Sequence, residues 1–477
     1  MSANRGFRTL VSLAVVLLGL ANTAQAQRSD DLPGPQSTWS LAAAGDAIIT
    51  RRISPFDHPG DPGFHRLAYL VRAADAAFVN LELSLFRLDS FEAWPEAENG
   101  GNWELAPPEV AYDLKEMGFD LYNRANNHTT DLGVEGMRLT NQLLDSLGLI
   151  HSGSGMNLGW ASRPGYLDTP KGRIALIGFA TTFTPMSRAS DPRGPYMGRP
   201  GLNPLRVRRT YEADSTTFEH LSTVAANLGG RVPEEPDEPI RLFGVRVHRG
   251  EVNRVVTELN SYDEERILGE IRNASRLADF VVVNSHSHDR GAERTQPPEW
   301  LREFAKRCLD AGAATYIIHG PHILRGIEIH DGKPIFYSLG NFIFQNETID
   351  PMPQDNYENY DLDEAALAAD LYDRRFRVNE EGEPTTGFPS SPVWYESVLA
   401  VPTFQGSRLV DLKLYPIDLA QTAPRSQRGT PRLADEGTGR KIIEHLGAMS
   451  AEFGTTIEYK NGIGVWRPVE PVTSPVR

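Results

Sequence analysis

Short apolar runs alternate with longer amphipathic stretches along most of the chain. The apolar runs have the length of strands and cover residues 40–45, 76–81, 119–123, 173–179, 280–284 and 315–318. Apolar side chains recur with a helical period over residues 134–147, 264–278 and 299–311, and Pro107-Pro108 opens a further helix that ends at Met117-Gly118. Strand and helix signals in alternation predict an α/β fold built from layers of sheet and helix.

The second half of the chain adds signals of antiparallel strands. Residues 326–329 and 333–337 flank His330-Asp331-Gly332, a sequence typical of a tight hairpin turn. Residues 398–401 and 409–414 form a second pair of apolar runs. We therefore expect the later part of the chain to add antiparallel strands to the core.

Two stretches break this rhythm. Residues from about 184 to 262 contain Pro-Gly turns and an acidic run, and residues from about 345 to 392 are rich in Asp, Glu, Asn, Tyr and Pro. Both are predicted to be insertions in a domain that spans residues 39–420, with residues 421–477 as a C-terminal extension. Inserted loops often form lids or binding walls, and surface segments without a role are an equal alternative here.

The N-terminus has the pattern of a secretory signal. Arg5 and Arg8 precede an uncharged apolar run at residues 10–20, which is followed by Ala24-Gln25-Ala26. Residues 1–26 are therefore predicted to be cleaved, because the apolar run is well short of the ~20 residues that span a bilayer. We expect the mature protein to be secreted, periplasmic or extracellular, and to have no transmembrane span.

The charge and the cysteine content narrow the class of protein. The chain has 48 Lys and Arg against 63 Asp and Glu, a net charge of −15, which argues against binding to nucleic acid or to an anionic membrane surface. An anionic substrate would need local attraction from metal ions or clustered arginines. Cys308 is the only cysteine, and its apolar neighbours favour a packed helical position over a catalytic thiol.

Polar side chains follow the predicted strands where each strand ends. Asp46 follows the first strand, Glu82 the second, and the third runs into a loop with Asn127, His128 and Asp131. The two strands at 280–284 and 315–318 are followed by His286, His288, His319 and His322. Each residue alone has a structural alternative, such as a turn or a cap. Together, carboxylate, amide and imidazole groups at strand ends predict a catalytic site for Mn²⁺, Fe, Zn²⁺ or Mg²⁺, and the lack of thiolates argues against a structural zinc.

These residues belong to longer motifs, spread from about residue 39 to residue 416. The motifs are Gly45-Asp46, Asn80-Leu81-Glu82, Asn126-Asn127-His128 with Asp131 and Gly133, His286, His319-Gly320-Pro321-His322, and Tyr337-Ser338-Leu339-Gly340-Asn341-Phe342. In order and spacing they resemble the CapA family of poly-γ-glutamate capsule proteins. The resemblance implies an α/β (α+β) fold, a four-layered calcineurin-like metallophosphatase β-sandwich flanked by helices, with two divalent ions.

The resemblance also implies a role for each residue. Glu82 would bridge the two ions, and His128 would donate a proton to the leaving group while Asp131 orients it by a hydrogen bond. The other metal ligands would be Asp46, Asn127, His286, His319 and His322.

Three positions depart from the family pattern. Ile48 stands where phosphoesterases carry a His, Gly320 stands where relatives often have a His, and His288 lies where they often have a Gly. His288 either replaces a missing ligand or lines the cleft. Occupancy by a single ion therefore stays open beside occupancy by two.

The candidate substrate-binding residues are partly arginines. Arg199, Asn203 and Arg206 are predicted to clamp carboxylates or phosphates, with solubilising surface charge as the equal alternative. His288 and Asn341 complete this set. The expected function is that of a metal-dependent hydrolase or transferase acting on a phosphoester or an anionic polymer such as poly-γ-glutamate, with capsule-synthesis membrane proteins as further partners. The alternative is a non-catalytic component that holds an emerging cell-surface polymer in a degenerate phosphoesterase cleft.

Overall fold

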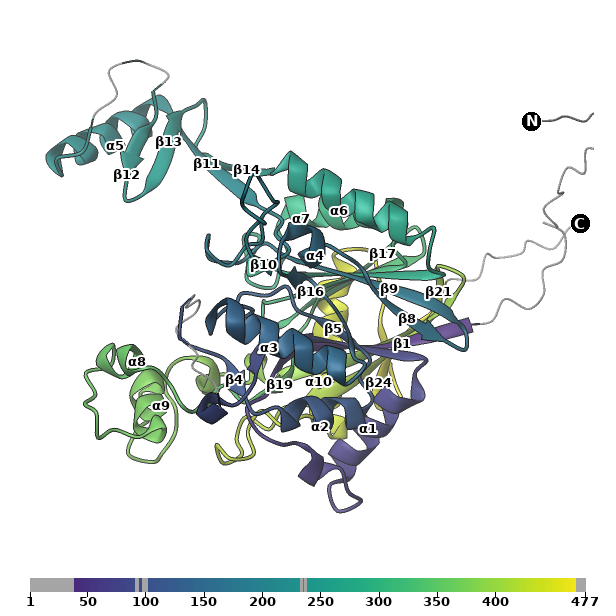
Figure 1. The fold of residues 1–477 in the computed structure, drawn as a ribbon. Helices are drawn as coiled ribbons and strands as arrows, with labels where there is room; N and C mark the ends of the chain where they lie inside the picture. Colours follow the sequence, from purple (N-terminus) through teal and green to yellow (C-terminus); the bar gives the residue numbers. More distant parts are fainter. Residues whose placement is uncertain (1–37, 91–93, 97–101, 232–234, 236–237, 469–477) are drawn as a thin grey trace, which may run out of the picture. The chain divides into compact units, whose positions relative to one another are not determined.

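Figure 1 shows the computed structural model of the 477-residue chain. It describes residues 38–90, 94–96, 102–231, 235 and 238–468. The predicted signal segment, residues 1–26, lies outside the described residues. Within the described part, none of the helices combines the length and the apolar character that crossing a bilayer requires.

The first of two main sheets has β1 at its centre, parallel to β2 and antiparallel to β20. Its strands, in order across the sheet, are β23 (Glu458–Lys460), β24 (Ile463–Trp466), β21 (Arg408–Asp418), β20 (Glu396–Gln405), β1 (Thr38–Ile48), β2 (Ala76–Leu81), β5 (Leu121–Asn123) and β6 (Ile150–Ser152). Two short strands join it, beside β1 and β21 respectively: β19 (Asn341–Phe344) and β22 (Arg432–Leu433).

The second sheet is parallel at its centre and antiparallel at both edges. Its strands, in order, are β17 (Leu324–His330), β18 (Lys333–Leu339), β16 (Thr315–His319), β15 (Phe280–His286), β9 (Gly172–Ala180) and β8 (Gly165–Thr169). The predicted hairpin around Asp331-Gly332 is confirmed as β17–β18, and both turn residues have positive φ. The predicted pairing of 398–401 with 409–414 is confirmed as β20–β21.

The central strands β2, β15 and β16 are buried on both faces of their sheets, and successive side chains of a strand point to opposite sides. Phe78 of β2 and Val282 of β15 belong to one apolar cluster between the sheets. Their neighbours point outward: Val79 packs in the cluster that contains Leu114, and Val283 packs with Phe304. Because side chains on both sides of these strands are buried, the strands appear in the sequence as continuous apolar runs.

Helices cover the outer faces and complete four layers (Figure 1). On the first sheet these are α1 (Pro62–Ala73), α2 (Glu109–Met117) and α3 (Gly133–Ser146), and on the second α6 (Ser261–Ala274) and α7 (Glu299–Asp310). The predicted layered α/β fold, with a sandwich of sheets flanked by helices, is therefore confirmed. Cys308 is fully buried in α7, as expected, and burial raises the pKa of its thiol well above the usual value.

The ends of the strands differ from the sequence prediction by a few residues. β1, β15 and β16 each run further than predicted, so that Asp46, His286 and His319 lie within strands and not in the loops after them. Helix α6 begins three residues earlier than predicted, where the Asn260 side chain accepts a hydrogen bond from the N–H of Asp263 and caps the first turn.

The stretch between about 184 and 262 forms its own small sheet, in the order β12-β13-β11-β14. Its elements are β10 (Gly201–Leu202), β11 (Val207–Ala213), α5 (Ser215–Asn227), β12 (Ile240–Leu242), β13 (Val245–Arg249) and β14 (Arg254–Leu259). Strand β10 pairs instead with β7 (Ser154–Gly155), which is followed by α4 (Leu158–Ala161). A separate apolar cluster that includes Phe218 and Ile240 lies between α5 and this sheet.

The stretch between about 345 and 392 packs against the segment that follows β2. It contains α8 (Gln354–Glu358), α9 (Ala368–Phe376) and η3 (Phe388–Ser390), and η4 (Pro392–Trp394) follows it. Leu371 and Tyr372 of α9 share an apolar cluster with Trp103 and Leu105. The segment after β2 contains β3 (Ser84–Leu85), η2 (Leu88–Ser90) and β4 (Leu105–Ala106).

Residues after 420 contribute to the main core. β23 and β24 extend the first sheet beyond β21, and α10 (Glu436–Ala451) contacts both β17 and β21. At the opposite end of the sequence, η1 (Ser54–Phe56) links β1 to α1.

Candidate metal centre

The carboxyl ends of strands from both main sheets meet at one buried cluster. Asp46 lies near the end of β1, Glu82 directly follows β2, and His286 and His319 are the last residues of β15 and β16. Asp46 Oδ1 is 3.3 Å from His319 Nδ1, and Glu82 Oε1 is 3.4 Å from His286 Nε2. All four side chains are fully buried, so side chains that are far apart in sequence share one small volume.

His322 reaches the same cluster from the turn after β16. Its backbone is left-handed, with φ of 57°, and its Nδ1 is 3.4 Å from Asp46 Oδ2 while its Nε2 is 3.8 Å from Glu82 Oε1. Asn341 holds this turn, because its Oδ1 lies 2.9 Å from His322 Nδ1 and its amide donates to the carbonyl oxygens of His322 and Trp394. In this structure Asn341 therefore positions His322.

His288 approaches from the loop that follows β15. Its Nε2 is 3.1 Å from His286 Nε2, and its backbone N–H donates to Thr182 Oγ1. The ring lies at the exposed side of the cluster, whereas His286 is fully buried. The two imidazoles thus meet although only His286 belongs to the strand.

Two overlapping groups of side chains have the geometry of metal ligands. Asp46, Glu82 and His286 each offer an atom within 4.8 Å of the others, and so do Glu82, His288 and His322. Glu82 belongs to both groups, which is the position of a bridging carboxylate. A third group, Asp310, His330 and Asp331, lies away from the cluster, and both of its carboxylates are exposed.

Several buried ligand atoms of the cluster have no hydrogen-bond partner among the described residues. They are Glu82 Oε1, Asn127 Oδ1 and both ring nitrogens of His319. A buried polar atom without a partner costs about 1–3 kcal/mol, so a protein rarely keeps four together without a ligand. Oxygen and imidazole nitrogen atoms are the donors that borderline divalent ions accept, and the residues therefore fit a metal.

The electrostatics of the cluster agree with this fit. Burial raises the pKa of Asp46, but the imidazoles of His319 and His322 beside it outweigh burial and hold that pKa well below the usual value. Burial, and then the nearby charge of Asp46, raise the pKa of Glu82 well above its usual value. Burial, followed by the charge of His288, lowers the pKa of His286, which favours the neutral imidazole that ligates metals.

A chain of amides supports the two carboxylates, and sequence reasoning did not assign it a role. Asn80 Nδ2 donates to Asp46 Oδ1 over 2.7 Å and lies 3.3 Å from Glu82 Oε2. Asn80 Oδ1 in turn accepts hydrogen bonds from Asn123 and Asn126. The signal in the sequence was the Asn at both motifs, Asn80-Leu81-Glu82 and Asn126-Asn127-His128.

Arg124 is a second supporting residue that the sequence did not reveal. Its guanidinium is fully buried and donates from Nη1 to the carbonyl oxygens of Leu81 and Leu83, on either side of Glu82. Burial lowers the pKa of Arg124 to about 10, which still leaves it charged at neutral pH. The segment that carries Glu82 is thereby fixed from both sides.

His128 forms a second unit beside the cluster. Its Nδ1 lies 2.7 Å from Asp131 Oδ2, and the same oxygen accepts the backbone N–H of Glu104 over 2.8 Å. An imidazole bound at Nδ1 by a carboxylate is fixed in orientation, and its Nε2 faces away from that carboxylate. The predicted pairing of His128 with Asp131 is thus present in the geometry.

Glu104 is a buried carboxyl that the sequence did not single out. Its Oε1 accepts a hydrogen bond from Asn102, whereas its Oε2 has no hydrogen-bond partner among the described residues. Burial raises the pKa of Glu104 from 4.5 to about 7. No motif marked this residue, because it lies in an irregular segment before β4.

A cavity of about 350 Å³ connects these groups to solvent. Asn127, His128, His288 and His322 line it. Its other walls carry Ile48, Asn102, Glu104, Arg290, Arg294, Gly320, Pro321, Arg325, Phe344, Asn346, Arg375, Phe388 and Trp394. Residues from both sheets and from the segment 345–394 therefore form one chamber.

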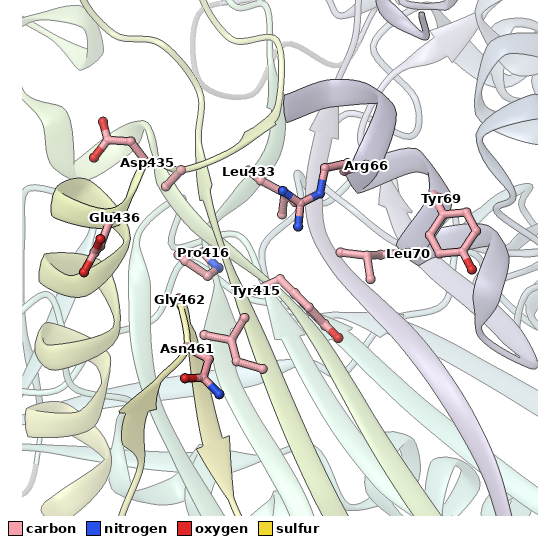
Figure 2. A pocket seen from close by; sticks show the side chains of 12 residues that line it. Arg66, Tyr69, Leu70, Tyr415, Pro416, Leu433, Asp435, Glu436, Asn461 and Gly462 are labelled. Carbon is pink, nitrogen blue, oxygen red and sulfur yellow. The ribbon is translucent and has the colours of Figure 1, made fainter. Parts of the chain in front are cut away.

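A larger cavity, of about 700 Å³, lies elsewhere, between α1, β21 and the start of α10. Figure 2 shows Arg66 and Tyr69 on one side of it and Asp435 and Glu436 on the other. It contains no histidine, and Asp435 already caps α10 through a hydrogen bond from Thr438. The histidine cluster is therefore the candidate functional site.

Of the five predicted substrate-binding residues, only His288 lines the cavity at the cluster, and Asn341 lies behind it, where it holds His322. Arg206 binds Asp263 through Nε and Nη2, and Arg199 donates to the carbonyl oxygen of Arg188. Asn203 donates to the carbonyl oxygen of Gly178 and accepts a hydrogen bond from Arg266. Asn203 and Arg206 thus tie the first insertion to β9 and α6, whereas the Arg199 contact stays within the insertion.

Comparisons with known proteins agree with the motifs. A family model described as bacterial capsule synthesis protein PGA_cap matches residues 40–346. Two proteins of Sinorhizobium fredii, y4sH and y4uA, both described as uncharacterized, are 38% identical over 92% of this chain and 96% of their own length.

Two relatives carry descriptive names. The PGA biosynthesis protein CapA of Bacillus subtilis is 29% identical over 48% of this chain and 44% of its own length. The capsule biosynthesis protein CapA of Bacillus anthracis is 25% identical over 64% of this chain and 59% of its own length. The family model spans well over half of the chain and contains every residue of the cluster, so the chain belongs to the family of bacterial capsule synthesis proteins, PGA_cap.

Proposed function

We propose that the protein is a metal-dependent hydrolase or transferase of capsule biosynthesis that acts on a phosphoester or on an anionic polymer. The observation that carries this proposal is the pair of ligand groups that share Glu82. Asp46 and His286 would hold one ion, and His288 and His322 the other. Asn127 and His319, whose Oδ1 and Nε2 atoms lack hydrogen bonds among the described residues, would complete the coordination.

The chain's own residues have distinct tasks in this proposal. Ions bound at the cluster would polarise the reacting group and lower the pKa of a bound water. His128 would donate a proton from Nε2 to the leaving group, because its Nδ1 is engaged by Asp131 and the ring lines the cavity. Asp131 would keep the ring in orientation, and Arg124 would keep Glu82 in place through the carbonyl groups beside it.

Ile48 supports a division of labour between the histidines. It lines the cavity near the end of β1, at the position where phosphoesterases carry a His, and it offers no ligand atom. His288 lies close to His286 and belongs to the second ligand group. We propose that His288 supplies the coordination that Ile48 cannot.

The test combines metal content with activity. Protein purified without chelator should contain about two equivalents of a transition metal by mass spectrometry and should hydrolyse an aryl phosphate in the presence of Mn²⁺. Asp46→Asn should lose metal and activity, whereas His128→Asn should keep the metal and lose at least 100-fold in kcat, the usual loss for a missing general acid. Asp310→Asn, in the group away from the cluster, is the matched control and should behave as the wild type.

The opposite result would favour the binding alternative. A wild-type protein without stoichiometric metal and without Mn²⁺-dependent hydrolysis would leave the cleft as a holder for polymer, and the enzyme proposal would be wrong. Equal loss of metal in Asp310→Asn and Asp46→Asn would show that the ions bind elsewhere.

We also propose that the mature protein acts outside the cytoplasm, together with capsule-synthesis membrane proteins. The signal pattern at residues 1–26 and the membership in a capsule synthesis family support this location. N-terminal sequencing of the protein recovered from the periplasm or the medium should begin at Gln27 or close to it. Recovery of the protein only from the cytosol, with Met1 still present, would contradict the proposal.

A further inference from the structure

Three arginines gather on one wall of the cavity beside the metal-type cluster. Arg290 and Arg294 lie in the loop between β15 and α7, and Arg325 lies on β17. All three line the cavity that also contains His128, His288 and His322. This group of arginines stands against the net charge of the chain, which is −15. It gives the cavity a local positive charge although the protein as a whole is negative.

Arg325 holds this wall together from inside the protein. Its side chain is buried, and its guanidinium donates from Nε to the carbonyl oxygen of Arg294 and from Nη1 to the carbonyl oxygen of Asp289. Burial, with smaller contributions from the charges of Arg290 and Arg294 and against the effect of Asp289, lowers the pKa of Arg325 to about 10. A buried cation thus fixes the loop that carries two further cations.

Neither Arg290 nor Arg294 forms an ion pair with a carboxylate in the described part of the chain. The guanidinium of Arg294 lies 4.8 Å from the centre of the Trp394 ring, which orients it along the cavity wall. The nearest acid in sequence, Asp289, is occupied by an ion pair with Arg209 and by a hydrogen bond from Thr181. The positive charge at the mouth is therefore not neutralised by the neighbouring aspartate.

The lining of the cavity includes one more cation. Arg375 of α9 lines the same cavity and donates to Asn102 Oδ1. It comes from the segment 345–392, which packs on the core through the cluster that contains Leu371 and Tyr372. The second insertion thus adds a fourth arginine to the lining of the chamber.

We propose that Arg290, Arg294 and Arg325 form a subsite that binds a second anionic group of the substrate, next to the group that reacts at the Asp46–Glu82 cluster. This inference rests on the proposed function, and it assigns the substrate to molecules with at least two anionic groups, as in an oligomer of carboxylates or phosphates. Guanidinium groups bind either anion through paired N–H donors, so the chemistry common to both is a planar or tetrahedral oxyanion. A simple monoester would leave the subsite empty.

The test measures binding of two anionic oligomers to the full-length mature protein by calorimetry. One probe is a γ-linked glutamate oligomer and the other is a short inorganic polyphosphate, each titrated into the Mn²⁺-loaded protein at low salt. The variant Arg290→Gln/Arg294→Gln should weaken the binding of the preferred oligomer at least ten-fold, and the salt dependence of its Kd should become shallower. The oligomer whose Kd responds identifies carboxylate or phosphate as the natural group.

Two further variants make the result specific. Arg66→Gln removes an exposed arginine from the other cavity (Figure 2) and should bind both oligomers as the wild type does. Arg290→Lys/Arg294→Lys keeps the charge without the paired donors and should recover part of the lost affinity. Arg325 is left intact because it braces the loop.

Two outcomes would overturn the subsite. One is equal binding of both oligomers by the wild type and the Gln variant at unchanged metal content. The other is an equal loss of affinity in Arg66→Gln. The failure of the proposed function would look different, because a protein without metal or hydrolysis can still be titrated with both oligomers.

Discussion

The buried carboxyl of Glu104 gives a pH dependence of stability that one substitution should remove. Its pKa in the folded protein is about 7, against 4.5 for an ordinary Glu, because burial disfavours the charged form. Between these two values the native protein holds a proton that the unfolded chain has released. The stabilisation is therefore complete below pH 4.5 and is lost as the pH rises through 7.

The magnitude follows from the two pKa values. Each pKa unit corresponds to about 1.4 kcal/mol, so the free energy of unfolding should fall by roughly 2–3 kcal/mol between pH 5 and pH 8 on account of Glu104 alone. Glu104→Gln keeps the acceptor for Asn102 and carries no titrating group. Other groups titrate in both proteins, and the difference between wild type and variant isolates this one carboxyl.

The assay is urea unfolding of both proteins at pH 5, 6, 7 and 8, with chelator present so that metal binding does not differ between them. The free energy of unfolding of the variant, relative to that of the wild type, should increase as the pH rises from 5 to 8. Glu380→Gln, at an exposed position, serves as the control, and its free energy of unfolding should change with pH as that of the wild type does. Parallel curves for Glu104→Gln would refute the reasoning, since they would mean that burial does not change the protonation of this side chain.

Three further predictions concern the packing of the core. Gly45→Ala should lower the free energy of unfolding in urea by at least about 2 kcal/mol, because a Cβ at this position would lie 1.9 Å from the carbonyl oxygen of Gly340. The control Gly437→Ala, in α10, should leave the stability unchanged or raise it. Similar unfolding midpoints for the two variants would contradict this prediction. Cys308 should react with a thiol reagent only after unfolding, since it is fully buried and its pKa is raised; rapid labelling of the native protein would disprove its burial. Trp39→Ala should cost about 3–5 kcal/mol, as Trp39 is buried between the sheets; a loss below about 1 kcal/mol, measured by the same unfolding assay, would show that the layer repacks easily.

The layers of the fold were predictable because their signal is local. Residues 76–81 form a strand that is buried on both faces, and such a strand appears in the sequence as a short, nearly continuous apolar run. The run therefore identifies the strand. The metal-type cluster was predictable for a related reason. Parallel strands of a sheet end at the same edge, so Asp46 lies beside Glu82 and His286 beside His319 once their strands are known, and the packing of the two sheets brings the pairs together.

The residues that escaped prediction depend on partners far away in sequence. Arg206 was predicted to bind an anionic substrate, but its guanidinium binds Asp263, 57 residues later in the sequence. Arg124 and Glu104 are charged residues in irregular segments, where exposure is the default expectation. Their burial follows from packing around the ends of β2 and β5, which no local pattern encodes.

The distribution of charge in the cavity suggests why a protein of net charge −15 can receive an anion at all. Asp46 and Glu82, buried behind His322 of the cavity wall, would repel an anionic group, and a cation bound at the cluster would reverse that field. Arg290 and Arg294 at the mouth attract an anion whether or not a metal is bound. In our proposal the arginines bring the substrate to the cavity and the bound ions select the group that reacts, so recognition and chemistry depend on different residues.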